Sequence, residues 1–473
     1  MGVISGKILK KNGWPEGPLI RLAKEAADAL WRDGLDREQI LARLEAVRAD
    51  PAAFLDDAAT GGLAQALTRA QAGPVQRDES LREAARDYPV WGREYIDPGA
   101  LAQMDNALRL PVSVAGALMP DAHVGYGLPI GGVLATAGAV IPYAVGVDIA
   151  CRMRLSIYPQ SPLLLDQKPA QFERALLSQT RFGMGAKWEK SQRPEHPVLD
   201  DVDWEATPLL RHLHDIAYEQ LGTSGTGNHF VEWGTLDLDV ELLGLQPGRY
   251  LALLSHSGSR GVGFKAAEHY SKLAMRLHPQ LDKAVRHLAW LDLDAEAGQE
   301  YWIAMELAGR FASANHFVIH HRVAAAAGLE EIAVVENHHN FAWRSRLADG
   351  TPVIVHRKGA TPAGAGVLGV IPGSMGDPGY VVRGRGVAAS LDSAAHGAGR
   401  QMSRKQALNT IAKRERDDYL RARGVTLLGG GLDESPQAYK RIDQIIAAQA
   451  DLVEIVGRFT PRIVRMADEP GDW

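Results

Sequence analysis

From about residue 115 to its C-terminus, the chain alternates short β-type runs with glycine-rich turns and helical stretches. Runs such as Arg154–Tyr158 and Tyr250–Leu254 have the length and residue types of strands. Apolar residues at helical spacing predict helices at 167–178, 264–276, 298–316, 402–421 and 436–448. No repeat period and no linker interrupts this region, so it predicts one large α/β (α+β) domain over residues 81–473.

The first 80 residues differ in composition from the rest of the chain and predict a helical accessory segment. Apolar residues recur at helical spacing from Leu19 to Leu30. Asp36, with Gln39 three residues later, matches a capping box, and Pro51 ends the next apolar stripe. Nothing catalytic stands out in residues 1–80, and simple surface cover for the main domain is the alternative interpretation.

Composition limits the classes of function that the chain can have. With 46% hydrophobic and 23% charged residues it has the balance of a soluble globular enzyme. The net charge of −5 means that any nucleic-acid contact would depend on a local arginine cluster. The single cysteine, Cys151, excludes a disulfide within the chain and fits a reducing cytoplasm. We expect a cytoplasmic protein without a membrane partner, since no apolar run resembles a signal peptide or a membrane span.

Five short segments hold an unusual share of the side chains that bind metals. They are Val147–Cys151, Gly227–Phe230, Ser255–Arg260, Glu336–Asn340 and the loop around His396. A carboxylate, a thiolate and three imidazoles are enough ligands for two divalent ions if the thiolate bridges. Any one of these histidines alone is more often a core or surface residue, and a lone cysteine is more often an inert thiol. Their placement in Gly, Ser and Asn loops favours a metal site.

The stretch from Asp392 to Arg404 predicts phosphate chemistry. It sets His396 in a small-residue frame, HGAG, with Arg400 and Arg404 shortly after it. Small residues let a phosphate approach, arginine holds phosphate oxygens, and a histidine among them can attack phosphorus. Pro372–Gly376 offers backbone N–H groups for an anion. An ordinary histidine in a glycine-rich loop is the alternative, and no Walker loop or Rossmann fingerprint indicates a standard nucleotide fold.

As an ordered set, these segments resemble the RtcB-type RNA ligases, the tRNA-splicing and RNA-repair ligases that use GTP and manganese. The resemblance extends from about Met119 to Asp443. Its motifs are MPDAHVGYGLPIGGV (119–133), GVDIAC (146–151), GTGNHF (225–230), SHSGSRGVG (255–263), HHN (338–340), HRKGAT (356–361), PGSMG (372–376), HGAGR (396–400) and ESPQAYKRID (434–443). Chance agreement over so many ordered motifs is remote.

The resemblance implies an α/β fold of the family's own kind, with the site in a central cleft. It implies that His396 takes GMP from GTP, and that two manganese ions share Cys151 as a bridging ligand. The other implied ligands are Asp148 and His229 for one ion, and His256 and His339 for the other; His339 is chosen over His338 because it directly precedes an asparagine. Implied guanylate contacts are Asn228, Phe230, Glu232, Asn340, Pro372, Gly373, Ser374, Met375, Gly397, Ala398 and Gly399. Implied RNA-phosphate contacts are Arg260 and Arg404.

The chain departs from the family pattern in three places. Arg465 or Met466 stands where the family has a lysine that contacts the guanine nucleotide. Arg152 comes directly after Cys151 where a glycine is usual, and Gly379 replaces a serine that often lines the nucleotide. These departures leave the metal and nucleophile positions intact and put the preference for GTP over ATP in question.

The sequence therefore predicts an RNA ligase that joins 3′-phosphate or 2′,3′-cyclic phosphate ends to 5′-hydroxyl ends, in RNA repair or tRNA splicing. Its expected partners are RNA with such ends and an archease-like activator. Two alternatives stay open: a metal-dependent phosphoesterase or nuclease that uses water as the nucleophile, and a non-catalytic RNA-binding relative.

Overall fold

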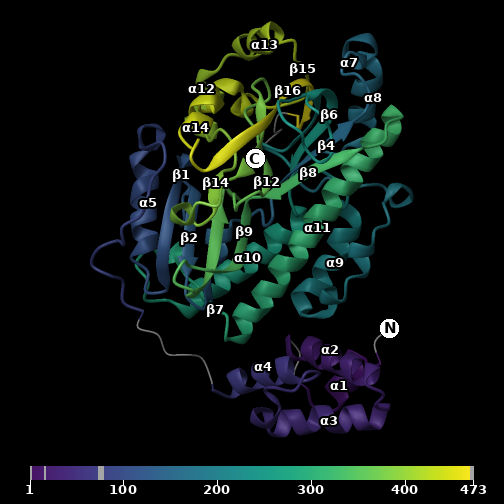
Figure 1. The fold of residues 1–473 in the computed structure, drawn as a ribbon, viewed down its shortest axis with the longest axis vertical. Coiled ribbons are helices and arrows are strands. Elements are labelled where there is room, and N and C mark those ends of the chain that lie inside the picture. Colours follow the sequence, from purple (N-terminus) through teal and green to yellow (C-terminus); the bar gives the residue numbers. More distant parts are fainter. Residues whose placement is uncertain (1–2, 15–17, 73–78, 469–473) are drawn as a thin grey trace.

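The computed structural model describes residues 3–14, 18–72 and 79–468. Figure 1 shows a small group of helices from the N-terminal segment beside a large mixed body. The small group contains α1 (Gly6–Lys11), α2 (Pro18–Arg32), α3 (Arg37–Ala49) and α4 (Gly61–Ala72). These helices bury a hydrophobic core of their own, in which no residue of the main body takes part. The N-terminal extension is therefore helical, as predicted.

The local signals of the N-terminal segment are confirmed. The side chain of Asp36 accepts the N–H of Gln39 at 2.9 Å, and the side chain of Gln39 accepts the N–H of Asp36 at 2.9 Å. This is the predicted capping box. Helix α3 ends at Ala49, two residues before Pro51. The division of the chain into 1–80 and 81–473 stays a prediction.

A four-stranded antiparallel sheet forms one half of the main body. Its strand order is β1-β2-β10-β9. The strands are β1 (Ser113–His123), β2 (Ile130–Thr136), β10 (Pro352–Lys358) and β9 (Asn340–Arg346). Helix α5 (Pro98–Leu108) packs against β1. The predicted strand at 353–356 lies within β10.

An eight-stranded sheet forms the other half. Its order is β12-β13-β16-β5-β6-β4-β8, and β15 pairs with β16 in the parallel direction. The strands are β12 (Leu368–Ile371), β13 (Gly379–Gly384), β16 (Val453–Met466), β5 (Phe230–Leu238), β6 (Gly248–Ser257), β4 (Arg152–Tyr158), β8 (Ala333–His338) and β15 (Thr426–Leu428). The two sheets meet at His339, which separates β8 of the larger sheet from β9 of the smaller one. The short pairs are β3 (Ala139–Val140) with β7 (Leu291–Asp292), and β11 (Ala360–Pro362) with β14 (Ser393–Ala395).

Helices cover the larger sheet on the side of α11, the long helix that runs obliquely across the body in Figure 1. It spans Glu296–Ala327 and packs against β4 and β6. The other helices are α6 (Pro142–Val145), α7 (Leu164–Gln167), α8 (Pro169–Gln179), α9 (Pro208–Gln220), α10 (Arg260–Leu277), α12 (Arg404–Thr410), α13 (Lys413–Ala422) and α14 (Ile442–Ala447). None of the helices in the described residues combines the length and the apolar character needed to cross a membrane.

Two predicted helices differ from the structure. The segment 402–421 is broken into α12 and α13, because Ile411 and Ala412 have extended backbones between them. In the segment 436–448 only 442–447 is α-helical, because Tyr439 is extended and pairs with Arg400. The pairing of Tyr439 with Arg400 is a tertiary contact that overrides the local helical pattern in the second of these segments.

Candidate functional site

Four neighbouring strands of the larger sheet have ends that lie side by side, and the side chains able to bind a metal are at these ends. Cys151 immediately precedes β4, and His229 immediately precedes β5. His256 lies next to the last residue of β6, and His339 comes immediately after β8. Strands β4 and β5 each pair antiparallel with β6, and β8 pairs antiparallel with β4. The starts of β4 and β5 therefore lie beside the ends of β6 and β8. Residues far apart in the chain are thus brought together by sheet topology.

Two ligand triplets share the Cys151 thiol. In the first triplet, His229 Nε2 lies 2.9 Å from an oxygen of Asp148 and 3.5 Å from the sulfur of Cys151. In the second triplet, His256 Nε2 lies 3.0 Å from the same sulfur and 3.1 Å from Nε2 of His339. Within each triplet all ligand atoms lie within 4.8 Å of one another. One sulfur between two three-residue sets is the arrangement that a bridged pair of divalent ions requires.

Hydrogen bonding and burial leave the second triplet ready to bind a cation. His256 Nδ1 is 2.9 Å from the backbone carbonyl of Asn228, so Nδ1–H donates there and the lone pair of Nε2 is free. Burial lowers the pKa of His256 to about 3, and burial also lowers the pKa of His339 far below its ordinary value. Both rings are therefore neutral, and each can offer a nitrogen lone pair to a cation. The buried Nδ1 of His339 has no hydrogen-bond partner among the described residues. This donor set fits a bound divalent ion.

The pKa values of the Cys151 thiol and the Asp148 carboxyl are shifted in opposite directions. Burial, reinforced by the nearby Asp148, raises the pKa of the Cys151 thiol well above its ordinary value. Burial is the strongest single influence and acts to raise the pKa of Asp148, but the hydrogen bond and charge of His229, together with Cys151 and Arg260, outweigh it and lower that pKa. Without a cation the sulfur keeps its proton, and binding of a metal would release it.

The loop from Asp148 to Cys151 is held in a strained shape by Asn340. Ala150 has a φ of +57°, an uncommon backbone conformation for a residue with a side chain. Its N–H donates to the backbone carbonyl of Asn340 at 2.7 Å. The side chain of Asn340 donates to the backbone carbonyl of Asp148 at 3.2 Å and accepts the N–H of Gly359 at 2.8 Å. The structure thus uses Asn340, an expected guanylate contact, to position ligand loops.

His396 lies beside the metal triplets, and a buried carboxylate orients it. Its ring centroid is 4.8 Å from that of His339. Its Nδ1 is 2.6 Å from Oδ2 of Asp121, which also accepts the backbone N–H of His396 at 3.2 Å. Asp121 is fully buried at the end of β1. Because Nδ1–H donates to this carboxylate, the lone pair lies on Nε2 and is free to attack an electrophile. The sequence predictions did not single out Asp121, although it lies in the motif at 119–133.

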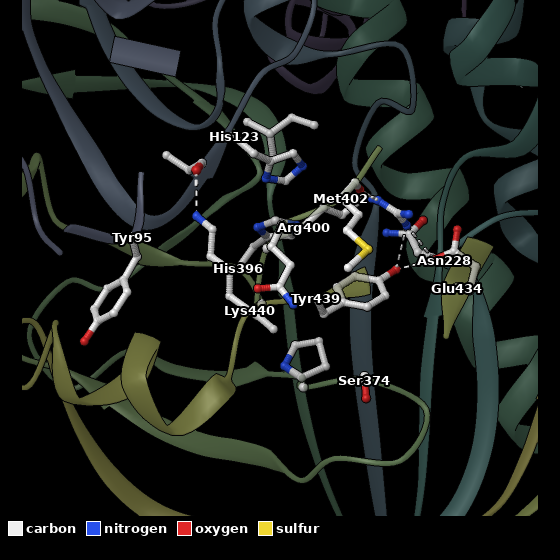
Figure 2. Close-up of a pocket in the computed structure, with 18 of the residues that line it drawn as sticks. Tyr95, His123, Asn228, Ser374, His396, Arg400, Met402, Glu434, Tyr439 and Lys440 are labelled. Carbon is white, nitrogen blue, oxygen red and sulfur yellow. Dashed lines mark hydrogen bonds and ion pairs between the residues drawn. The ribbon is translucent and has the colours of Figure 1, made fainter. Parts of the chain in front are cut away.

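A cavity of about 1260 Å³ opens next to His396. Its wall includes expected nucleotide contacts: Asn228, Phe230, Pro372, Gly373, Ser374, Met375, Gly397, Ala398 and Gly399. Figure 2 shows Asn228, Ser374 and His396 around this space, with His123 and Lys440 close by. Glu232 is buried on β5 and does not line the cavity. The cavity has room for a nucleotide and for part of a second substrate.

The two arginines expected to hold RNA phosphate occupy different settings. Arg404 lines the cavity, is 47% exposed, and forms ion pairs with Asp433 at 2.5 Å and with Glu434. Arg260 is away from the cavity wall: its guanidinium donates to the Thr223 hydroxyl at 3.1 Å and to a backbone carbonyl at 2.9 Å. The structure therefore brings Arg404 to the cavity and does not bring Arg260 there.

Lys440, in the cavity wall, is also a residue for which the sequence analysis predicted no role. Its ammonium group donates to the backbone carbonyls of Pro120 at 3.2 Å and Ala122 at 2.7 Å, at the end of β1. It lines the cavity with His396, as Figure 2 shows, and burial lowers its pKa to about 8. Two of its three donors are occupied by these carbonyls, so one N–H remains for a ligand.

The pairing of β16 determines whether Arg465 or Met466 faces the cavity. Met466 pairs with Phe230, is buried and lines the cavity. The side chain of Arg465 instead donates to the carbonyl of Leu428 at 2.8 Å and forms an ion pair with Asp468 at 3.0 Å. Of the two candidates for the family's lysine position, Met466 is thus the one in the cavity wall.

The other two departures lie at the margins of the site. Arg152 forms an ion pair with Glu336 and lies 3.4 Å from Nδ1 of His338. It therefore fixes the histidine that is not in the triplet. Gly379 begins β13, and a Cβ there would be 3.3 Å from the Cα of Pro372 in the cavity wall.

Comparison with known proteins identifies the family to which the chain belongs. A family model described as tRNA-splicing ligase RtcB matches residues 103–467. The RNA-splicing ligase RtcB of Escherichia coli (strain K12) is 33% identical over 393 residues, covering 76% of this chain and 92% of that protein. The tRNA-splicing ligase RtcB of Thermococcus kodakarensis is 30% identical over 474 residues, covering 82% of this chain and 98% of that protein. These matches place the chain among the RNA ligases. It belongs to the RtcB family.

Proposed function

We propose that this protein joins RNA 3′-phosphate or 2′,3′-cyclic phosphate ends to 5′-hydroxyl ends, using GTP and two manganese ions. The observation that carries this proposal is the position of His396. It lies beside two ligand triplets, is oriented by Asp121, and lines a cavity large enough for a nucleotide. We further propose that the protein works on RNA in the cytoplasm, in tRNA splicing or RNA repair, with an archease-like activator.

His396 is the nucleophile in this scheme. Its Nε2 forms a bond to the α-phosphorus of GTP while the bond from that phosphorus to the bridging β-oxygen breaks, and pyrophosphate leaves. The N–H on Nδ1 stays hydrogen-bonded to Asp121, whose carboxylate offsets the positive charge that develops on the ring. A phosphate oxygen of the RNA 3′ end next attacks the same phosphorus and breaks its bond to nitrogen. The 5′-hydroxyl oxygen of the second RNA attacks the activated 3′-phosphate, loses its proton and displaces GMP.

The two triplets are the proposed metal ligands. Asp148, Cys151 and His229 would hold one ion, and Cys151, His256 and His339 the other. Bound divalent ions would polarise phosphate oxygens and offset their negative charge. Sulfur ligands favour zinc, whereas the carboxylate and the family resemblance favour manganese. We propose manganese for the active enzyme.

The base of the nucleotide would lie against an apolar part of the cavity wall. Phe230, Met375 and Met466 form that part. None of these side chains can donate a hydrogen bond to the O6 of guanine, so this apolar part of the wall does not discriminate guanine from adenine. GTP is the proposed nucleotide, with discrimination against ATP weaker than a lysine at position 466 would give.

A test that separates the candidate functions uses one RNA with a labelled 3′-phosphate and a second RNA with a 5′-hydroxyl. With GTP and manganese, we expect the label to enter a longer RNA and to become resistant to phosphatase. Release of labelled inorganic phosphate without a nucleotide would instead establish a phosphoesterase. Binding of both RNAs without any change to the label would establish a non-catalytic RNA-binding protein.

A further inference from the structure

Three rings gather on chain segments that adjoin residues of the cavity wall, and the proposed chemistry does not use them. Tyr126 is 69% exposed, and its ring centroid is 6.1 Å from that of His287 at an interplanar angle of 63°. The ring of Tyr143 lies 5.0 Å from that of His287. We call Tyr126, Tyr143 and His287 the rim rings. A mostly exposed tyrosine contributes little to folding, so it is available for a ligand.

The rim rings are continuous with the cavity. Val124 lines the cavity and is two residues from Tyr126, so their Cα atoms are at most about 7 Å apart. Val147 also lines the cavity and lies four residues after Tyr143. Val124 and Val147 are themselves 52% and 41% exposed. A ligand that extended from the cavity past these two valines would reach the segments that carry Tyr126 and Tyr143.

The loop that carries Tyr126 is held in place before any ligand arrives. The buried ammonium of Lys358 donates to the backbone carbonyl of Tyr126. Gly127 has a φ of +70°, and a Cβ there would lie 3.0 Å from the backbone oxygen of His287. The loop therefore packs tightly on the segment that carries His287. Pre-organisation of this kind lowers the entropy lost when a ligand binds.

Two cationic side chains lie in the segment that carries His287. Lys283 and Arg286 are exposed, and neither forms an ion pair with a residue in the described ranges. The nearby carboxylate of Asp282 accepts the N–H of Ala284 at 2.9 Å. In a chain with a net charge of −5, unpaired cations beside exposed rings indicate a binding site for an anion that carries planar groups.

We propose that the rim rings form a stacking platform for an unpaired nucleobase of the RNA substrate, with Lys283 and Arg286 holding phosphates of the same strand. This inference rests on the RNA-joining activity proposed above. Single-stranded RNA ends present unstacked bases, and an aromatic ring accepts any base on its face. An apolar protein segment would use the rings without the cations, so the charges favour RNA.

The test compares Tyr126→Ala, Tyr126→Phe and Lys283→Ala/Arg286→Ala in the full-length chain, with Tyr218→Ala as the matched control. Tyr218 is a 39% exposed tyrosine on α9 that is absent from the cavity wall. The probes are a fluorescent single-stranded RNA with a 3′-phosphate, one with a 5′-hydroxyl, and copies of each that lack a single base. Binding anisotropy and joining are measured for each protein, and so is covalent labelling by GTP alone.

We expect Tyr126→Ala to weaken the binding of one of the two RNAs about tenfold, while Tyr126→Phe and Tyr218→Ala retain wild-type affinity. Covalent labelling by GTP should be unchanged in all of them. Removing one particular base should weaken wild-type binding and have no further effect in Tyr126→Ala. The inference is overturned if Tyr126→Ala binds both RNAs with wild-type affinity. It is also overturned if the loss of affinity caused by Tyr126→Ala is the same for every RNA copy, whichever base that copy lacks. Joining by the wild type reports on the proposed function separately, because the binding measurement does not depend on it.

Discussion

Asp121 and His396 are 275 residues apart in the chain, yet one hydrogen bond between them sets which ring nitrogen can react. The sequence predicts His396 as a nucleophile because its small-residue frame and the nearby arginines are local features. It does not predict the role of Asp121 or of Lys440, which bonds to a carbonyl 320 residues away. Their roles depend on long-range contacts that no local spacing encodes. The same reason explains why Arg260, an arginine in a promising motif, lies away from the cavity wall.

Substitution of the shared thiol should remove both ions. Because Cys151 belongs to both triplets, Cys151→Ala leaves two ligands in each set and no bridging atom. We expect less than about one-tenth of the wild-type metal content after dialysis, with the thermal unfolding temperature of the metal-free protein nearly unchanged. Metal analysis by mass spectrometry gives the result. Two ions per chain in the alanine variant would show that the thiol is not a bridging ligand.

Asp121→Asn should slow the first chemical step without loss of the fold. The amide has the same shape but cannot stabilise a positive ring, and its N–H₂ group would compete for Nδ1 of His396. We expect covalent labelling by GTP to slow by about 100-fold or more. Asp97→Asn is the control, because Asp97 also lines the cavity and its side-chain oxygen accepts the N–H of Gly99. Equal rates for wild type and Asp121→Asn would remove the orienting role.

The charge on Lys440 should set an upper pH limit for activity. A lysine is charged below its pKa, and burial lowers the pKa of Lys440 to about 8. If its ammonium holds a phosphate, the joining rate falls as the pH rises above about 8, with loss of one proton. In Lys440→Arg the cation persists at higher pH, so the alkaline decline should disappear. The same decline in Lys440→Arg would assign it to another group.

At the scale of elements, the sequence predicts the regular parts and misses the interrupted ones. Strands at 154–158, 250–254 and 353–356 have the expected residue types and lie within β4, β6 and β10. Helices at 264–276 and 298–316 lie within α10 and α11, two long helices of 18 and 32 residues. The predicted helix at 436–448 is interrupted where Tyr439 pairs with Arg400, and that pairing is a tertiary effect.

The two ligand triplets at the strand ends of the larger sheet also predict that one metal ion can be lost without the other. A Cβ at Gly258, just beyond β6, would overlap Oδ1 of Asp148. Gly258→Ala should therefore displace Asp148 and reduce the metal content from two ions per chain to one, because the second triplet does not use Asp148. Gly248→Ala, at the opposite end of the same strand, meets its nearest atom at 3.7 Å and is the control. Loss of both ions, or of neither, would contradict the assignment of separate triplets.

At the scale of the whole molecule, two sheets contribute to one site. His339, just beyond the end of β8 in the larger sheet, lies beside His396, which in turn contacts Asp121 at the end of β1 in the smaller sheet, and the cavity opens next to His396. The N-terminal helices keep their own core and lie outside residues 103–467, which match the family. The sequence predicts this division by composition, but the meeting of the two sheets at His339 depends on topology. The chemistry therefore depends on how the two sheets are joined.

The most direct test of the account is covalent labelling. The protein is incubated with manganese and GTP labelled on the α-phosphorus, and the denatured chain is assayed for bound label. We predict one label per chain, labile in acid and stable in base as a phosphoramidate is, and none in His396→Ala. The same experiment with labelled ATP should give slower but detectable labelling, since Met466 stands in the cavity wall. Label in His396→Ala, or no label in the wild type with either nucleotide, would contradict the mechanism.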